Sequence, residues 1–188
     1  MPQRKPSGFE RARTVARQSL ADLIRDEQKR AQLHIRVIRK AEPSASNDRV
    51  ARVIVERWIK VAQVEGGVTG ALGFLGVPIN FVLFAYFQLA AIVSVAEAYG
   101  TPLSGTSGED LILQVFGRAH GIEDVVRASP RVVGALAKAL ALKHGLGTLG
   151  RLMPMVAAPI AAKLNAREMQ RVGDEAMRRF GHVVLIPG

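Results

Sequence analysis

Apolar residues recur at helical spacing over the first third of the chain and predict two amphipathic helices. No Gly or Pro occurs between residues 9 and 40, and apolar positions return every three to five residues or so through much of this run. Those positions are Val15, Leu20, Leu23, Ile24, Leu33, Val37 and Ile38. A break in this helix, if there is one, is expected near the charged residues 25–30. After a turn at 42–48, an apolar stripe from Val50 to Ala62 predicts the second helix.

The middle and the end of the chain predict further helices of different character. Residues 80–99 are apolar on almost every position, which is typical of a helix that is covered all round. A loop rich in Gly, Pro and Ser follows at 99–108, and Ser107 has the spacing of a helix cap. Further helices are expected from Pro130 to Leu142 and from about 149 to 180.

These elements predict an all-α fold, a compact bundle of about six helices with a central apolar helical hairpin that Gly and Pro interrupt. No alternating polar and apolar run of convincing length indicates a sheet. We expect a disordered basic tail at 1–8, a single helical domain at 9–182 and a short tail at 183–188. A chain of 188 residues is long enough for one domain with a real core.

Residues 66–80, GGVTGALGFLGVPIN, raise the question of a phosphate-binding loop. The glycine spacing fits neither nucleotide-binding motif, no lysine follows, and the residues before it are predicted to be helical. We therefore expect close helix packing and a bend at this stretch, because glycine lets backbones approach and proline ends or kinks a helix. The residues assigned to packing and bending are Gly67, Gly70, Gly73, Gly76 and Pro78.

The same region decides how the protein could relate to a membrane. Between Glu65 and Glu97 lie 31 uncharged residues, more than the roughly 20 that a spanning helix needs. Three alternatives stay open: a hairpin buried in protein, a hairpin or helix that dips into a membrane, and a full span. In the second alternative, aromatic side chains would insert into lipid or line an apolar cavity: Phe74, Phe81, Phe84, Tyr86 and Phe87.

Charge is distributed unevenly, and this predicts an acidic partner. Residues 1–60 carry 15 Lys and Arg against 7 Asp and Glu, residues 61–117 carry no cation against 4 acids, and residues 118–188 carry 11 cations against 5 acids. Basic ends of this kind attract an anionic membrane or nucleic acid. The alternative is that the charge only keeps the protein soluble. The sequence contains neither a recognisable two-helix DNA-binding unit nor aromatic residues interleaved with Arg, so it does not favour specific binding of nucleic acid. The predicted contacts to anionic lipid are Arg4, Lys5, Arg11, Arg13 and Arg17.

The sequence supports no particular chemistry. Cysteine is absent, the four histidines do not share a metal-binding spacing, and no cofactor motif occurs. Acidic residues cluster with His120 near residues 109–124, but helix capping explains them more simply than an acid/base pair does. We therefore expect no catalytic residue, no metal and no cofactor.

Two later blocks of small residues resemble the EcsC protein family. The first block contains Gly67, Gly70, Gly73, Pro78, Tyr99 and Gly100, and the second contains Pro154, Asn165, Val172, Gly173 and Ala176. The chain departs from similar proteins at Asn80, where an acidic residue is common. Because this family is associated with an ABC-transporter operon, the resemblance implies a membrane-linked accessory role, with components of a membrane transporter as partners, and it carries over no catalytic residue.

Together these features predict a non-enzymatic helical module in the cytoplasm, peripheral to the inner face of the membrane, that binds an anionic membrane surface or lipid. The alternative from another class is a soluble homo-oligomeric scaffold in which the 66–97 hairpin forms the subunit interface. A small-molecule hydrolase around His120 is the third hypothesis.

Overall fold

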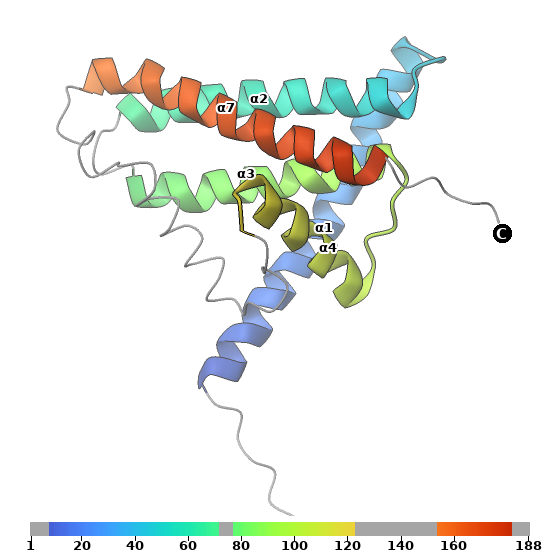
Figure 1. Cartoon of the computed structure of the whole chain (residues 1–188), viewed down its shortest axis with the longest axis horizontal. Coiled ribbons are helices and arrows are strands. Elements are labelled where there is room, and N and C mark those ends of the chain that lie inside the picture. Colours follow the sequence, from blue (N-terminus) through green and yellow to red (C-terminus); the bar gives the residue numbers. More distant parts are fainter. Residues whose placement is uncertain (1–7, 72–76, 123–153, 182–188) are drawn as a thin grey trace, which may run out of the picture.

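The computed structural model describes residues 8–71, 77–122 and 154–181 of the chain. These residues form helices and no strand, which confirms the all-α prediction (Figure 1). The predicted helix from Pro130 to Leu142 lies outside the described residues, so the described part has five helices against the expected six or so. The helices are α1 (Gly8–Ala41), α2 (Asn47–Ala71), α3 (Val77–Ala98), α4 (Gly105–Ala119) and α7 (Pro154–Gly181).

The helices pack in two layers around α3. Helices α2 and α7 lie side by side along much of their length and form one layer, and α3 packs beneath both (Figure 1). Helix α1 crosses the far side of α3 diagonally, and α4 packs against α3 and α7. The apolar middle of the chain is therefore the centre of the bundle, and the charged helices surround it.

Helix α1 is continuous from Gly8 to Ala41, so the break considered near residues 25–30 does not occur. Ile24 and Ala31, two turns apart, are buried, and they fix the inner side of this helix. The charged residues between them do not interrupt it, because all but Glu27 are exposed and can stay in water.

The contact between α2 and α7 is close because one of its residues is glycine. Val172 and Ala176 of α7 are fully buried, and Gly173 between them lies against Val55 of α2. A Cβ atom at Gly173 would be 2.4 Å from Cγ1 of Val55, well inside van der Waals contact. A larger residue at 173 would therefore keep the two helices apart.

Helix α3 is buried over most of its C-terminal half. The side chains of residues 88–96 are all buried, which confirms that this half is covered all round and shows that it is covered by protein. The helix ends at Ala98, and the turn after it contains Gly100, whose φ of +70° favours glycine. The N–H groups of Gly100 and Thr101 donate to the carbonyls of Glu97 and Ala96 and so satisfy the last turn.

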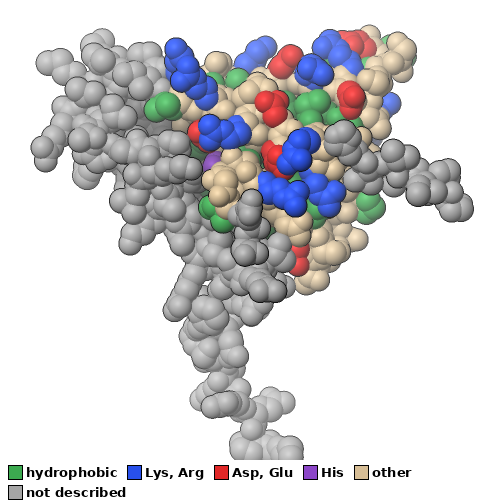
Figure 2. Space-filling model, viewed as in Figure 1, with side chains coloured by type: hydrophobic (Ala, Val, Ile, Leu, Met, Phe, Trp, Pro, Cys, Tyr) green, Lys and Arg blue, Asp and Glu red, His purple; other side chains and the backbone are tan. Residues whose placement is uncertain are grey.

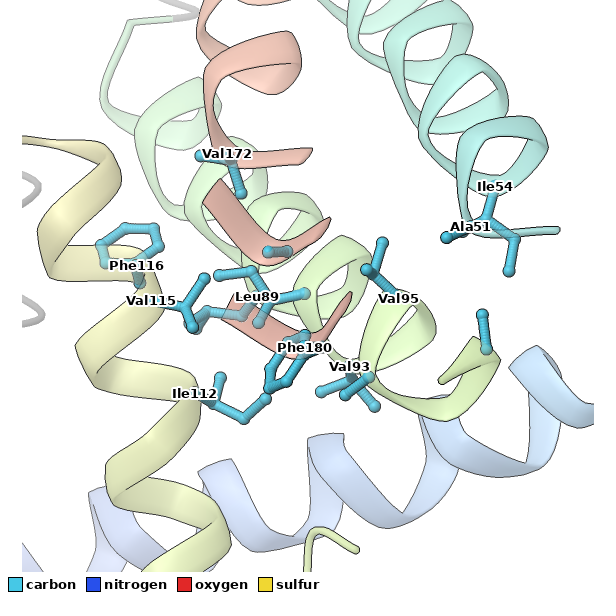
Figure 3. Packing of buried hydrophobic residues seen from close by; sticks show 14 of the residues in the cluster. Ala51, Ile54, Leu89, Val93, Val95, Ile112, Val115, Phe116, Val172 and Phe180 are labelled. Atoms are coloured by element: carbon cyan, nitrogen blue, oxygen red, sulfur yellow. The ribbon is translucent and has the colours of Figure 1, made fainter. Parts of the chain in front are cut away.

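Side chains from α3, α4 and α7 interlock in the core (Figure 3). Phe180 near the end of α7 points toward Ile112 of α4 and Val93 of α3. All three are buried. The end of α7 is thereby fixed to two other helices, in addition to its long contact with α2.

Candidate functional site

The outward side of α1 carries two large apolar side chains among cations. Leu33 is 58% exposed and Val37 is 67% exposed, one helical turn apart. No acidic residue occurs between residues 28 and 41, and five exposed cations lie there. These cations are Lys29, Arg30, Arg36, Arg39 and Lys40. We call these seven residues the α1 outer face.

The sequence pattern grouped Leu33 and Val37 with Ile24 as apolar positions at roughly helical spacing, but the structure buries Ile24 and exposes the other two. Leu33 follows Ile24 by nine residues, which at about 100° per residue places it on the opposite side of the helix. Ile24 is buried and Leu33 is exposed, as this angle requires. The angle around the helix axis between Ile24 and Leu33 can be calculated from the sequence, and it could have revealed the α1 outer face.

The surface over α7 differs, because its charges are mixed. Figure 2 shows Lys and Arg side chains interspersed with Asp and Glu on the face that carries α7. Two of these cations form ion pairs one turn along the helix, Arg171 with Glu168 at 3.2 Å and Arg178 with Glu175 at 2.6 Å. A face of mixed charge attracts an anionic surface less than the α1 outer face does.

A buried carboxyl group lies beneath α1. Glu27 is 3% exposed, and its Oε1 accepts a hydrogen bond from Oγ of Ser94 at 2.9 Å. The Ser94 hydroxyl also lies 2.9 Å from the carbonyl of Ala90 and accepts from Nε1 of Trp58 at 3.3 Å. A hydroxyl has only one proton to share between two acceptors, so a protonated Glu27, which can itself donate to Ser94, satisfies this network best.

Burial raises the pKa of Glu27, while the Ser94 hydrogen bond and the charges of Arg30 and Arg57 oppose that rise. The folded protein therefore holds this proton more tightly than the unfolded chain does. The stability that Glu27 contributes is full below its ordinary pKa near 4.5 and is lost as pH rises through its higher folded-state pKa.

We accordingly expect Glu27→Gln, which cannot ionise and can still donate to Ser94, to be more stable than the unchanged protein at pH 7. The difference in the free energy of unfolding is expected to shrink toward zero at pH 4. Urea denaturation of both proteins between pH 4 and pH 8 measures this difference. A difference that is the same at every pH would contradict a buried, titrating Glu27.

Five charged or titratable residues lie where α1, α2 and α3 come together. Nη1 of Arg30 lies 3.6 Å from Oε2 of Glu27 and 3.4 Å from the Tyr86 hydroxyl oxygen. Nη1 of Arg57 lies 2.5 Å and 2.7 Å from the two ring nitrogens of His34. Burial and the neighbouring Arg57 charge lower the pKa of His34. A neutral imidazole can accept the Arg57 hydrogen bond, and an imidazolium cannot.

Three of the aromatic residues predicted to contact lipid, Phe84, Tyr86 and Phe87, lie on α3 close to these charged residues. Phe87 lies between Trp58 and Tyr86, with ring centroids 5.9 Å and 6.1 Å away. Phe84 and Phe87 are half-buried and pack on a small cluster formed by Ala62, Ala91 and Met169. These two rings are therefore partly covered by protein.

The remaining predicted site residues lie near or beyond the limits of the described structure. Arg11, Arg13 and Arg17 belong to the N-terminal part of α1, which extends past the other helices (Figure 1). Gly67 and Gly70 lie within α2, and Pro78 and Phe81 lie in the first turns of α3. Outside the described residues lie Arg4, Lys5, Gly73, Phe74 and Gly76.

His120 occupies a buried junction of α3, α4 and α7. Its Nε2 lies 3.1 Å from Oε1 of Gln88, its Nδ1 lies 3.7 Å from Oε2 of Glu168, and its ring packs on Phe116. The side chains of His120 and Gln88 are almost fully buried. The two ring nitrogens thus face neighbouring helices, an arrangement that ties the end of α4 to α3 and α7.

The described part of the chain contains no candidate membrane span and no candidate metal site. None of its helices is both long enough and apolar enough to cross a membrane. Nowhere in residues 8–71, 77–122 and 154–181 do three or more potential metal ligands come together.

Comparison with known proteins identifies a family. The sequence profile of the EcsC protein family matches residues 15–130. The matched segment includes most of α1, all of α2, α3 and α4, and the first block of small residues, through Tyr99 and Gly100. No curated protein and no solved structure shows significant similarity to the chain.

Proposed function

The chain belongs to the EcsC protein family, and from this premise we propose that it is a non-enzymatic helical module that associates with an anionic membrane surface through the α1 outer face. The observation that carries the proposal is the exposure of Leu33 and Val37 among cations. Apolar side chains that enter the interface, with Lys and Arg beside them, are the combination that binds peripheral helices to anionic lipid.

The position of α1 supports this assignment. Its inner side carries the buried residues Ile24 and Ala31, and the helix packs mainly on α3, so its outer side can meet a flat surface without unfolding the bundle. Arg11, Arg13 and Arg17 belong to the same helix and add to its positive charge. A protein bound in this way at the inner membrane face would also be placed to meet components of a membrane transport system.

Vesicle flotation tests the proposal. We expect the protein to float with vesicles of 30% phosphatidylglycerol in phosphatidylcholine, to float less in 0.5 M salt, and not to float with pure phosphatidylcholine. The double variant Leu33→Ser/Val37→Ser is expected to bind at least tenfold more weakly, because it removes the apolar part of the interaction.

A matched control is available on α2. Val64 is 68% exposed, almost the same as Val37, and it lies outside the α1 outer face. Val37→Ser is expected to weaken flotation, while Val64→Ser, the same chemical change, leaves it unaltered. Equal flotation of both variants would contradict the proposal. A dimer that dissociates only in Val37→Ser, without flotation, would assign this face to a second copy of the chain instead.

A further inference from the structure

We propose that Arg30, His34 and Arg57 form a binding site for the phosphate group of an anionic phospholipid, at the edge of the α1 outer face. This inference deepens the proposed membrane association and rests on it. It adds a specific headgroup contact to an otherwise diffuse attraction.

The two guanidinium groups border His34: Nη1 of Arg57 contacts its ring, and Arg30 lies one helical turn earlier on α1. Arg30 is within 3.6 Å of the Glu27 carboxylate, and the charge of Arg57, on a different helix, also lowers the pKa of Glu27. Glu27 itself is buried, whereas the side chain of Arg30 is 59% exposed and Arg57 is exposed. The site therefore has a buried floor and two cations that face solvent.

The charge of this site is not balanced. The charges of two guanidinium groups act on one carboxyl group, Glu27, and burial favours the neutral form of that group. An excess of positive charge therefore remains at neutral pH. Guanidinium groups bind phosphate oxygens through paired N–H donors, so a phosphate is the anion that suits this arrangement.

The surroundings favour a lipid phosphate over a soluble one. Leu33 follows Arg30 by one helical turn and adjoins His34, so insertion of Leu33 would bring both residues to the headgroup level. On the other side, Tyr86 contacts Arg30 and packs on Phe87. Apolar surface thus borders the cations, as a glycerol and acyl chain require.

His34 links this binding to protons. Arg57 on α2 contacts its ring, and Arg30 lies one turn earlier on its own helix, where it contacts the Tyr86 hydroxyl of α3 and the Glu27 carboxyl. Both arginines are positive. A bound phosphate would offset those charges and favour the imidazolium, so binding takes up a proton. Affinity for a phosphodiester lipid should therefore rise as pH falls from 7.5 to 6.0. In a Glu27→Gln background, where Glu27 cannot titrate, His34→Gln should remove the remaining pH dependence.

Nuclear magnetic resonance of the His34 ring tests the site directly. Short-chain dihexanoyl phosphatidylglycerol, kept below its micelle concentration, is expected to shift these signals in a saturable way. Arg30→Ala and Arg57→Ala should each weaken this binding about tenfold, because each removes a charge-assisted contact. Arg167→Ala, the same change at an exposed position of α7, is the control and should leave it unaltered.

Two further measurements make the outcome unambiguous. Glu27→Gln removes the opposing charge and should strengthen binding severalfold, which a loss of folding cannot imitate. Circular dichroism establishes that each variant is folded. Shifts of His34 with inorganic phosphate but not with the lipid would replace the lipid by a soluble phosphate, and no shift with either would overturn the site.

Failure of the site and failure of the proposed function give different results. Wild-type protein that floats with anionic vesicles, while His34 does not respond to the short-chain lipid, refutes the site and leaves the membrane association standing. Absence of flotation in the wild type refutes the membrane association itself, and a lipid-specific site falls with it.

Discussion

Gly173→Ala is expected to lower the free energy of unfolding by about 2 kcal/mol, as overpacked cores do. The added Cβ would lie 2.4 Å from Cγ1 and 2.9 Å from Cγ2 of Val55, and neither atom can withdraw easily, because Val55 is buried and β-branched. In an open helix the same substitution would stabilise by roughly 1 kcal/mol. The sign of the measured change therefore reports how close α2 and α7 are.

A double-mutant cycle attributes this loss to one contact. Val55→Ala removes the two methyl groups that the new Cβ would meet. We expect Gly173→Ala to cost much less in a Val55→Ala background than in the wild type, with a coupling of about 1 kcal/mol or more in urea denaturation. Additive effects, or a Gly173→Ala variant more stable than the wild type, would show that the helices are not in close contact here.

Phe180→Ala is expected to be the most destabilising of these changes, with a loss of about 4 kcal/mol. Phe180 is fully buried and points toward Ile112 and Val93, so removal of its ring leaves a cavity where α3, α4 and α7 meet (Figure 3). A stability change of this size is a large part of what a domain of this length has in total.

Thermal and urea denaturation of Phe180→Ala measure that loss. Leu33→Ala is the control, because Leu33 is large and apolar but exposed, and it should change stability by less than about 0.5 kcal/mol. Similar losses in the two variants would mean that Leu33 is covered in solution. That result would also weaken the proposal that the α1 outer face is free to bind a membrane.

The α1 helix combines two roles that its sequence does not separate. Its inner side is part of the core through Ile24, and a buried carboxyl at Glu27 lies next to that contact. Its outer side carries Leu33 and Val37 among cations. The phosphate site that we propose lies between these two sides, so a change at Glu27 is expected to alter both stability and lipid binding.

Local patterns in the sequence were sufficient to predict most of the helices. The absence of Gly and Pro from 9 to 40, and the apolar stripe after residue 50, correspond closely to α1 and α2. The predicted ends of the helices were less accurate. Helix α4 begins at Gly105, two residues before Ser107, the expected cap. The Ser107 hydroxyl lies inside the helix and donates to the carbonyl of Ser104. Such choices between neighbouring caps depend on small energies.

The sequence by itself determined the fold class, the family and the uneven distribution of charge, because periodicity, motif and composition are properties of the chain. Only the tertiary structure decided which side of α1 is inside, that the C-terminal half of α3 is covered by protein, and that Arg57 of α2 contacts His34 of α1. These features depend on contacts between residues far apart in the chain. Local periodicity reports the direction of side chains around one helix but not which other helix they meet.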